Sequence, residues 1–300
     1  MLILTVCIFA APGAAGDVGL SLPSPNEWHI PKFIGWVLNG SLIFLSIAVV
    51  SQANRQYNFI PSNDYALPAL LSIILCSLCI TNATISTSTI LLATNIVGLY
   101  ILFGTYESYN ASMEFFILAS LLAVGSMFQY AFLMMIPAYI VGGILMKSLR
   151  FREVAAFILG LIAPYWVLVG LDIVPMPSFE APHTLKVMSE AKGDHDLFIA
   201  LIAGIIMCIL GILMTIYNSL RLLMRNARPR SMHGTINVMG IICALCMLLN
   251  FNNFVSYLGT IALWLAIETA MMFDLYETRT PSAWVGGISL VFIIIFIIFL

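Results

Sequence analysis

The feature that most constrains this chain is a series of ten apolar runs, each close to the length needed to cross a membrane. A helix that spans hydrocarbon about 30 Å thick needs roughly 20 apolar residues at 1.5 Å each. Because 61% of the residues are hydrophobic and only 9% are charged, a water-soluble fold is excluded. The runs lack the alternating pattern of a membrane barrel, so helices are expected.

We therefore predict an all-α, polytopic integral membrane bundle of about ten or eleven transmembrane helices. Residues 1–16 resemble a signal peptide or a short first transmembrane helix, and residues 17–300 form a single transmembrane domain. The ten runs are approximately 33–51, 65–82, 86–104, 113–129, 130–147, 153–174, 197–217, 234–251, 254–273 and 280–300.

Basic residues predict the orientation, because short loops rich in Lys and Arg stay in the cytoplasm. If the ten segments alternate, nine of the 12 basic residues fall on one side and only Lys32, Lys186 and Lys192 fall on the other. We predict cytoplasmic loops at 147–152 and 218–233 and external loops at 17–32 and 175–196. The expected location is the bacterial inner membrane, as a multi-pass protein.

One acidic residue lies within an apolar run. Glu268 is six residues before Asp274, and an ionised side chain inside a membrane helix is costly and often functional. On a helical period it shares a stripe with Tyr257, Thr260 and Trp264, which could face a ligand or a buried polar partner. The alternative is a carboxylate that reaches the nearby interface.

Metal and cofactor sites are not predicted. The pairs Cys76/Cys79 and Cys243/Cys246 have metal-ligand spacing, but buried inert thiols are the favoured explanation, because hydrocarbon disfavours the thiolates that a metal needs. The four histidines, His29, His183, His195 and His233, are all expected outside helix interiors, with His233 on the side opposite the others. No phosphate loop, nucleophile elbow or redox-cofactor motif is present, and the net charge of -2 gives no surface for nucleic acid.

Four arginines form the strongest charge run, and they predict a contact with anionic lipid headgroups or with a cytoplasmic partner. They are Arg221, Arg225, Arg228 and Arg230. Two prolines, Pro137 and Pro164, are expected inside helices, where they would cause kinks that could line a cavity.

A stretch covering most of residues 33–175 resembles an uncharacterised family of multi-pass inner-membrane proteins from Bacteroidota. The similarity is carried by Asn54-Arg55, Pro68-Ala69-Leu70, the hairpin to Tyr106, and above all Phe151-Arg152-Glu153 followed by Gly160-Leu161-Ile162-Ala163-Pro164-Tyr165. That resemblance implies a polytopic membrane fold and a role in the cell envelope, without a defined reaction.

The same stretch is more distantly similar to the helical core of multi-pass glycosyltransferases that use polyprenyl-phosphate-linked sugars. Those enzymes place an acidic residue in the first external loop, as a base or a metal partner. The resemblance therefore implies that Asp17, Glu27 and His29 would be the catalytic residues here.

Three functions remain open from the sequence. The first is a non-catalytic envelope protein that acts as a scaffold or partner subunit for other inner-membrane proteins. The second is a glycosyltransferase-like enzyme that uses Asp17 or Glu27. The third is a transporter of small solutes or lipids, for which a cavity is expected near Pro137, Pro164 or the stripe from Tyr257 to Glu268.

Overall fold

The computed structural model describes most of the chain. It covers residues 30–60, 65–78, 85–174, 195–222, 227–249, 253–275 and 280–299, together with Leu22, Pro23, Pro25, Trp28 and Thr81. Only the backbone is described at 195–196, 220–222, 273–275, 280–281 and 299. The predicted segment 1–16 lies outside these residues, as do nine of the 16 residues of the predicted external loop 17–32 and all but the last two of the loop 175–196.

The predicted all-α fold is confirmed, and the described residues contain no strand. Each of the ten predicted runs corresponds to one helical segment. Six of these helices are long and apolar enough to cross a membrane, and four are shorter apolar helices, which is the pattern of a multi-pass membrane protein. The segments are α2 (Lys32–Tyr57), α3 (Ala66–Ser77), α5 (Thr87–Gly104), α6 (Ser112–Phe128), η2 (Tyr130–Met135) continuing into α7 (Ile136–Leu145), α8 (Phe151–Gly170), α10 (His195–Leu222), α11 (Ala227–Leu249), α12 (Phe254–Leu275) and α13 (Thr280–Phe299).

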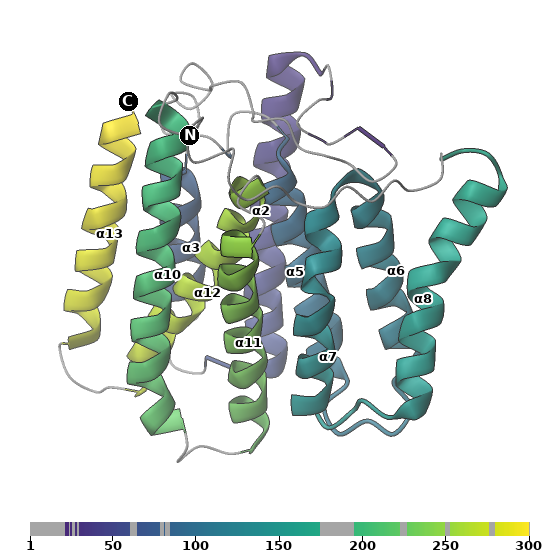
Figure 1. The fold of residues 1–300 in the computed structure, drawn as a ribbon. Helices are drawn as coiled ribbons and strands as arrows, with labels where there is room; N and C mark the ends of the chain where they lie inside the picture. The colour runs from purple at the N-terminus through teal and green to yellow at the C-terminus, as the bar shows by residue number, and fades with distance from the viewer. Residues whose placement is uncertain are drawn as a thin grey trace.

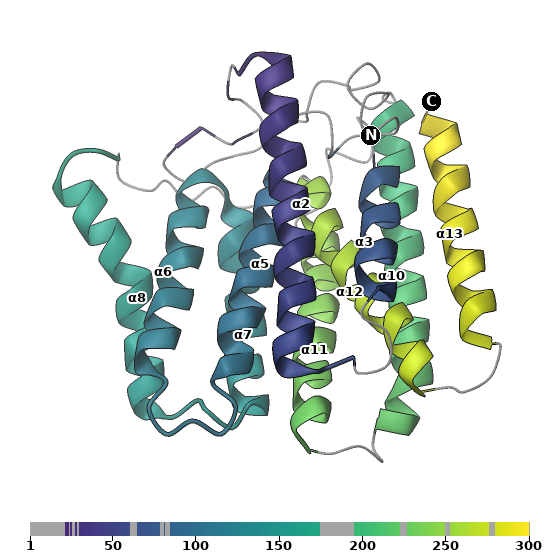
Figure 2. The same ribbon diagram turned by 180° about the vertical axis from the view of Figure 1, so that it is seen from behind.

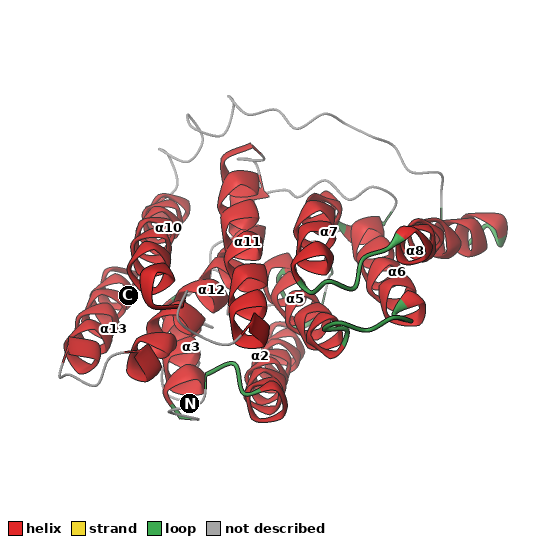
Figure 3. Cartoon of the chain, turned by 90° about the horizontal axis from the view of Figure 1, so that it is seen from below, coloured by secondary structure: helices red, strands yellow, loops and turns green. Residues whose placement is uncertain are grey.

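Helix α12 lies at the centre of the bundle. It packs on α10, α5, α11 and α3, and the view along the bundle shows these neighbours around it (Figure 3). In its most apolar window 94% of the residues are buried, against 17% for α8, which packs chiefly on α6. The side chains of α12 therefore meet other helices in every direction, and any polar group on it needs a protein partner.

The described connections α5–α6 and α7–α8, together with the end of α10 and the start of α11, lie at one end of the bundle (Figures 1 and 2). We call this the basic end, because several basic residues lie there. Arg55 is in the last turn of α2, Lys147 and Arg150 lie between α7 and α8, and Arg228 and Arg230 are in the first turn of α11. The grouping of these residues at one end agrees with the predicted orientation. Which side of the membrane this end faces stays a prediction.

The predicted loop at 218–233 is wrong. Helix α10 continues to Leu222 and α11 already begins at Ala227, so residues 218–222 and 227–233 are helical. The error has a physical cause, because charged residues such as Arg228 and Arg230 end a hydrophobic run without ending a helix that continues into the polar headgroup layer. The loop predicted at 147–152 agrees better, since α7 ends at Leu145 and α8 begins at Phe151.

The two prolines behave differently. Pro137 lies within the predicted segment, but in the first turn of α7, where its missing N–H is not needed and no kink follows from it. A short 3₁₀ segment, η2, precedes it. Pro164 is inside α8, as predicted, and the part of α8 that follows it leans away from α6 (Figure 1).

A salt bridge joins the α5–α6 and α7–α8 connections at the basic end. Lys147 Nζ donates to Glu107 Oε1 over 2.9 Å, and the backbone N–H of Glu107 donates to Met146 O. This hydrogen bond lowers the pKa of Glu107 below its ordinary 4.5 and raises the pKa of Lys147 above its ordinary 10.5. The pair therefore stabilises the fold at pH values between 4.5 and 10.5. Its contribution is lost as the pH falls through the lowered pKa of Glu107 or rises through the raised pKa of Lys147.

This arrangement predicts the titration of Glu107. In a carbon NMR titration, the Glu107 carboxyl of the parent is expected to have a midpoint below 4.5, and in Lys147→Met the midpoint should return to about 4.5. Both side chains are more than half exposed, so no large change in stability is expected. An unchanged midpoint in Lys147→Met would show that the salt bridge does not form in solution.

Candidate functional site

The stripe predicted on α12 is buried. Tyr257, Thr260, Trp264 and Glu268 are each no more than 1% exposed. Three of them form side-chain hydrogen bonds to neighbouring helices, and these bonds make up three successive polar contacts along α12. The stripe therefore faces polar protein partners, which was one of the two arrangements expected for it.

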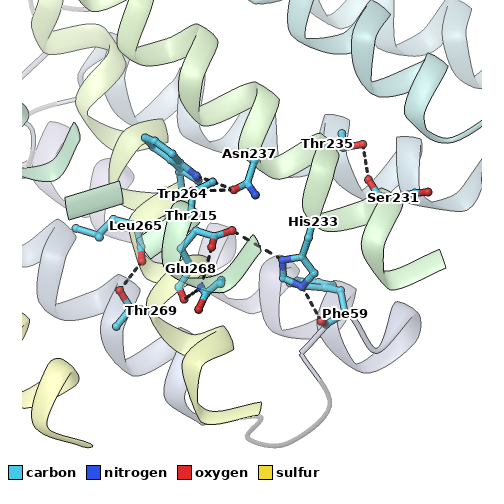
Figure 4. Close-up of polar contacts among 11 residues, drawn as sticks. Phe59, Thr215, Ser231, His233, Thr235, Asn237, Trp264, Leu265, Glu268 and Thr269 are labelled. Atoms are coloured by element: carbon cyan, nitrogen blue, oxygen red, sulfur yellow. Dashed lines mark hydrogen bonds and ion pairs between the residues drawn. The ribbon is translucent and has the colours of Figure 1, made fainter. Parts of the chain in front are cut away.

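Glu268 has partners on α10 and α11. The side-chain amide of Asn218 on α10 donates to Glu268 Oε2 over 2.9 Å and to the backbone carbonyl of Glu268 over 2.8 Å. His233 on α11 places Nδ1 3.9 Å from Glu268 Oε1, and its Nε2 lies 2.9 Å from the carbonyl oxygen of Phe59 (Figure 4). The Glu268 and His233 side chains are at most 1% exposed, so this pair is shielded from water.

The hydrogen atoms of this pair can be assigned from its contacts. A carbonyl oxygen only accepts hydrogen bonds, so the contact with Phe59 requires a hydrogen on His233 Nε2. His233 Nδ1 and Glu268 Oε1 face each other and neither has another hydrogen-bond partner. Without a proton between them, two lone pairs would face each other in a buried site. A proton on either atom would remove this repulsion, and we call the facing pair of Glu268 and His233 the proton site.

A second polar contact lies one helical turn before Glu268 on α12, at Trp264. The indole Nε1 of Trp264 donates to Asn237 Oδ1 on α11 over 3.0 Å, and Thr215 on α10 donates to the same oxygen over 3.2 Å. The ring of Trp264 lies against Gly240 on α11 and Gly211 on α10, neither of which has a side chain in its way. Asn237 thus ties α10, α11 and α12 together beside the proton site.

A third contact lies near the middle of the bundle. Asn95, the ninth residue of the 18 in α5, donates from its side-chain amide to Thr260 Oγ1 over 2.8 Å. The hydroxyl of Tyr139 on α7 donates to Asn95 Oδ1 over 2.9 Å. Both side-chain atoms of Asn95 therefore have partners, and the residue joins α5, α7 and α12.

The proton site is close to the basic end. Glu268 lies seven residues before the end of α12 at Leu275, and His233 lies six residues after the start of α11 at Ala227. At 1.5 Å per residue each lies about 10 Å from its helix end. This depth is within the third of a hydrocarbon layer of about 30 Å that adjoins the basic end. The interfacial arrangement considered for Glu268 is excluded by its burial.

His233 was predicted outside helix interiors, and that prediction is wrong. It lies within α11 and is 1% exposed. A signal was present in the sequence, because His233, Asn237 and Gly240 are spaced four and three residues apart and so share one helix face. The signal was missed because the charged start of α11 was interpreted as a loop.

The other candidate residues contribute less. Asp17, Glu27 and His29 lie outside the described residues, so the structure gives no geometry for a glycosyltransferase site. Of the four arginines, Arg228 and Arg230 are exposed at the basic end, whereas Arg225 and the side chain of Arg221 are not described. The guanidinium of Arg228 lies 6.0 Å from the ring centre of Tyr57 and 5.9 Å from that of Tyr106.

A groove of about 500 Å³ lies between α5 and α6, on the side of the bundle away from the proton site. Its lining is apolar, and the hydroxyl of Ser120 is already bonded to the carbonyl of Phe116. It is therefore unsuited to a polar solute. The lining residues are Pro25, Trp28, Ile90, Thr94, Phe116, Ile117, Ser120, Leu121, Val124, Gly125, Phe128 and Phe132.

Within the described part of the chain, no three His, Cys, Asp or Glu side chains converge as a metal site. Comparisons with known protein families, with curated proteins and with solved structures give no match. The functional argument therefore depends on the buried contacts of α12 alone.

Proposed function

We propose that this chain is a proton-coupled carrier of small solutes in the bacterial inner membrane, with its proton bound between Glu268 and His233. The observation that carries the proposal is the facing pair of Glu268 Oε1 and His233 Nδ1, 3.9 Å apart and without other hydrogen-bond partners. Ionisable residues are expensive inside a membrane, and chains of Glu and His there are typical of proton relays.

Two further features support a role in transport. The proton site joins α10, α11 and α12 to the junction after α2, so a change in its charge acts on four parts of the bundle at once. Histidine is also the side chain whose ordinary pKa allows a change of charge between about pH 5 and pH 8. In this proposal Arg228 and Arg230 contact anionic lipid headgroups on the cytoplasmic side.

Infrared difference spectroscopy in lipid nanodiscs tests the proton site. Between about pH 5 and pH 8, the parent is expected to show the carbonyl band of one carboxylic acid that loses its proton or the matching changes of a protonated imidazole. Both signals should be absent from Glu268→Gln. Glu153→Gln is the matched control, because Glu153 is another buried glutamate, 1% exposed, at the start of α8.

Transport is measured in proteoliposomes that contain a pH-sensitive dye. Panels of amino acids, sugars and organic acids are added outside, and at least one class is expected to change the internal pH with the parent and at least tenfold less with Glu268→Gln. A pair that does not titrate, or one that titrates without any solute-driven pH change, would contradict the carrier. A scaffold would then be favoured, and loss of function in Asp17→Asn or Glu27→Gln would favour the enzyme.

A further inference from the structure

The junction after α2 turns back into the bundle at the basic end. Asn58 has a left-handed backbone, with φ of 51°, and the next two residues, Phe59 and Ile60, are only 2% and 0% exposed. The side chain of Asn54 fixes this turn, because its Oδ1 accepts from the N–H of Ile60 over 2.9 Å and its Nδ2 donates to the carbonyl of Ile60 over 3.0 Å. A connection between two helices would normally lie on the surface, so its burial requires an explanation.

Phe59 contacts the proton site directly. The carbonyl oxygen of Phe59 accepts a hydrogen bond from His233 Nε2. The centre of the Phe59 ring lies 6.2 Å from the centre of the His233 ring and 5.6 Å from the centre of the Phe103 ring. The bond from His233 is therefore a link between the proton site and the buried junction.

Phe59 also lines a small cavity. About 20 Å³ of space, surrounded by apolar side chains, lies between α2, α5, α11 and α12. Its lining includes Phe59 and Phe103. It also includes Ile236 of α11, the helix that carries His233, and Ile267 of α12, the helix that carries Glu268. If residues 58–60 moved outward, this space would open toward the basic end beside the proton site.

We propose that residues 58–60 form a gate at the basic end, which His233 holds closed while the proton is bound and releases when the proton leaves. The inference rests on the proposed function, because it requires the pair of Glu268 and His233 to exchange a proton. It adds the element through which that exchange acts on the bundle.

The mechanism follows from the number of hydrogen atoms on the imidazole. With the proton bound, either on His233 Nδ1 or on Glu268 Oε1, Nε2 keeps its hydrogen and donates to Phe59. When the proton leaves to water, the ring has one hydrogen and two acceptors compete for it, the Glu268 carboxylate and the Phe59 carbonyl. Hydrogen bonds to a charged acceptor are about twice as strong as neutral ones, so the hydrogen moves to Nδ1. Nε2 then presents a lone pair to the carbonyl of Phe59, and the link is lost.

The other ionisable groups near the junction are one arginine and two tyrosines. From α11, Arg228 lies over the rings of Tyr57 of α2 and Tyr106 after α5. Arginine and tyrosine ordinarily titrate at about pH 10 and above. The groups from α10 and α12 are Asn218, which does not titrate, and Glu268. The side chains of Arg221 and Asp274 are outside the described residues.

Hydrogen–deuterium exchange tests the gate without altering it. The N–H of Ile60 is bonded to Asn54 Oδ1, so its exchange reports the opening of the junction. After correction for the intrinsic pH dependence of exchange, a peptide that covers residues 58–60 is expected to exchange about tenfold faster near pH 8 than near pH 5. In Glu268→Gln the rise should disappear, because an amide can donate to Nδ1 at either pH and leave the Nε2 hydrogen on Phe59.

The outcomes separate the two proposals. If the exchange of residues 58–60 does not change with pH while infrared spectra show that the pair releases a proton, the gate is wrong and the proton site stands. If the pair does not titrate at all, the proposed function fails as well. A rise that persists in Glu268→Gln, or that appears equally in peptides around Glu107 and Lys147, would show general loosening and contradict the gate.

Discussion

Replacing Gly240 by alanine is expected to destabilise the bundle by about 2–6 kcal/mol. An added Cβ would overlap ring atoms of Trp264, which is 1% exposed and is confined because its other edge lies against Gly211 on α10. Overpacking a filled core costs about 1–3 kcal/mol. Displacing the indole also removes its hydrogen bond to Asn237 and leaves a buried donor without a partner, which costs about 1–3 kcal/mol more.

The measurement is unfolding in mixed micelles of a mild detergent and dodecyl sulfate. Gly286→Ala is the matched control, because Gly286 is a glycine in helix α13 with no atom within 4 Å of its Cβ position. That control is expected to be neutral or slightly stabilising, since alanine has the higher helix propensity. Equal stabilities of the two variants would mean that Trp264 does not pack between α10 and α11 as described.

Replacing His233 by leucine is expected to cost about 3–5 kcal/mol, the cost of removing one partner from a buried pair. Glu268 Oε1 would then lack any donor, although Asn218 would still bind Oε2. In the double variant His233→Leu/Glu268→Leu, both polar groups are gone, so the combined cost should be lower than the sum of the two single costs by about 1 kcal/mol or more.

The same unfolding assay measures this cycle. Thr235→Val is the control, because Thr235 lies two residues away on α11 and its hydroxyl only bonds back to Ser231 within the helix. It is expected to cost only about 0.5–1.5 kcal/mol, the net contribution of one hydrogen bond. If the cost of the double variant equals the sum of the two single costs, His233 and Glu268 do not interact. That result would contradict the proposed proton site.

Most of the fold could be predicted from the sequence, because bilayer thickness leaves few choices for long apolar runs. The run predicted at 254–273 is the helix Phe254–Leu275, for example. Composition fixes helix ends less well. The run predicted at 65–82 ends as a helix at Ser77, where Leu78 leaves the helical conformation although the sequence remains apolar.

The site could be predicted only in part. The spacing of Thr260, Trp264 and Glu268 placed them correctly on one helix, because the period of a helix depends on local geometry alone. Their partners depend on how distant helices pack. Asn218 lies 50 residues from Glu268 in the sequence, and the acceptor for His233 is a backbone carbonyl, which every residue has and which no sequence pattern marks.

The central position of α12 has a consequence for how the protein is made. A helix that is 94% buried in its most apolar window has almost no face for lipid, and it carries Glu268. When ribosomes deliver it to the membrane, α3, α5, α10 and α11 have already been synthesised, because they precede α12 in the sequence. The earlier helices must therefore remain parted at the insertion site until α12 arrives. The bundle reaches its final packing late in biosynthesis, and truncation before α12 would leave its intended neighbours without a core.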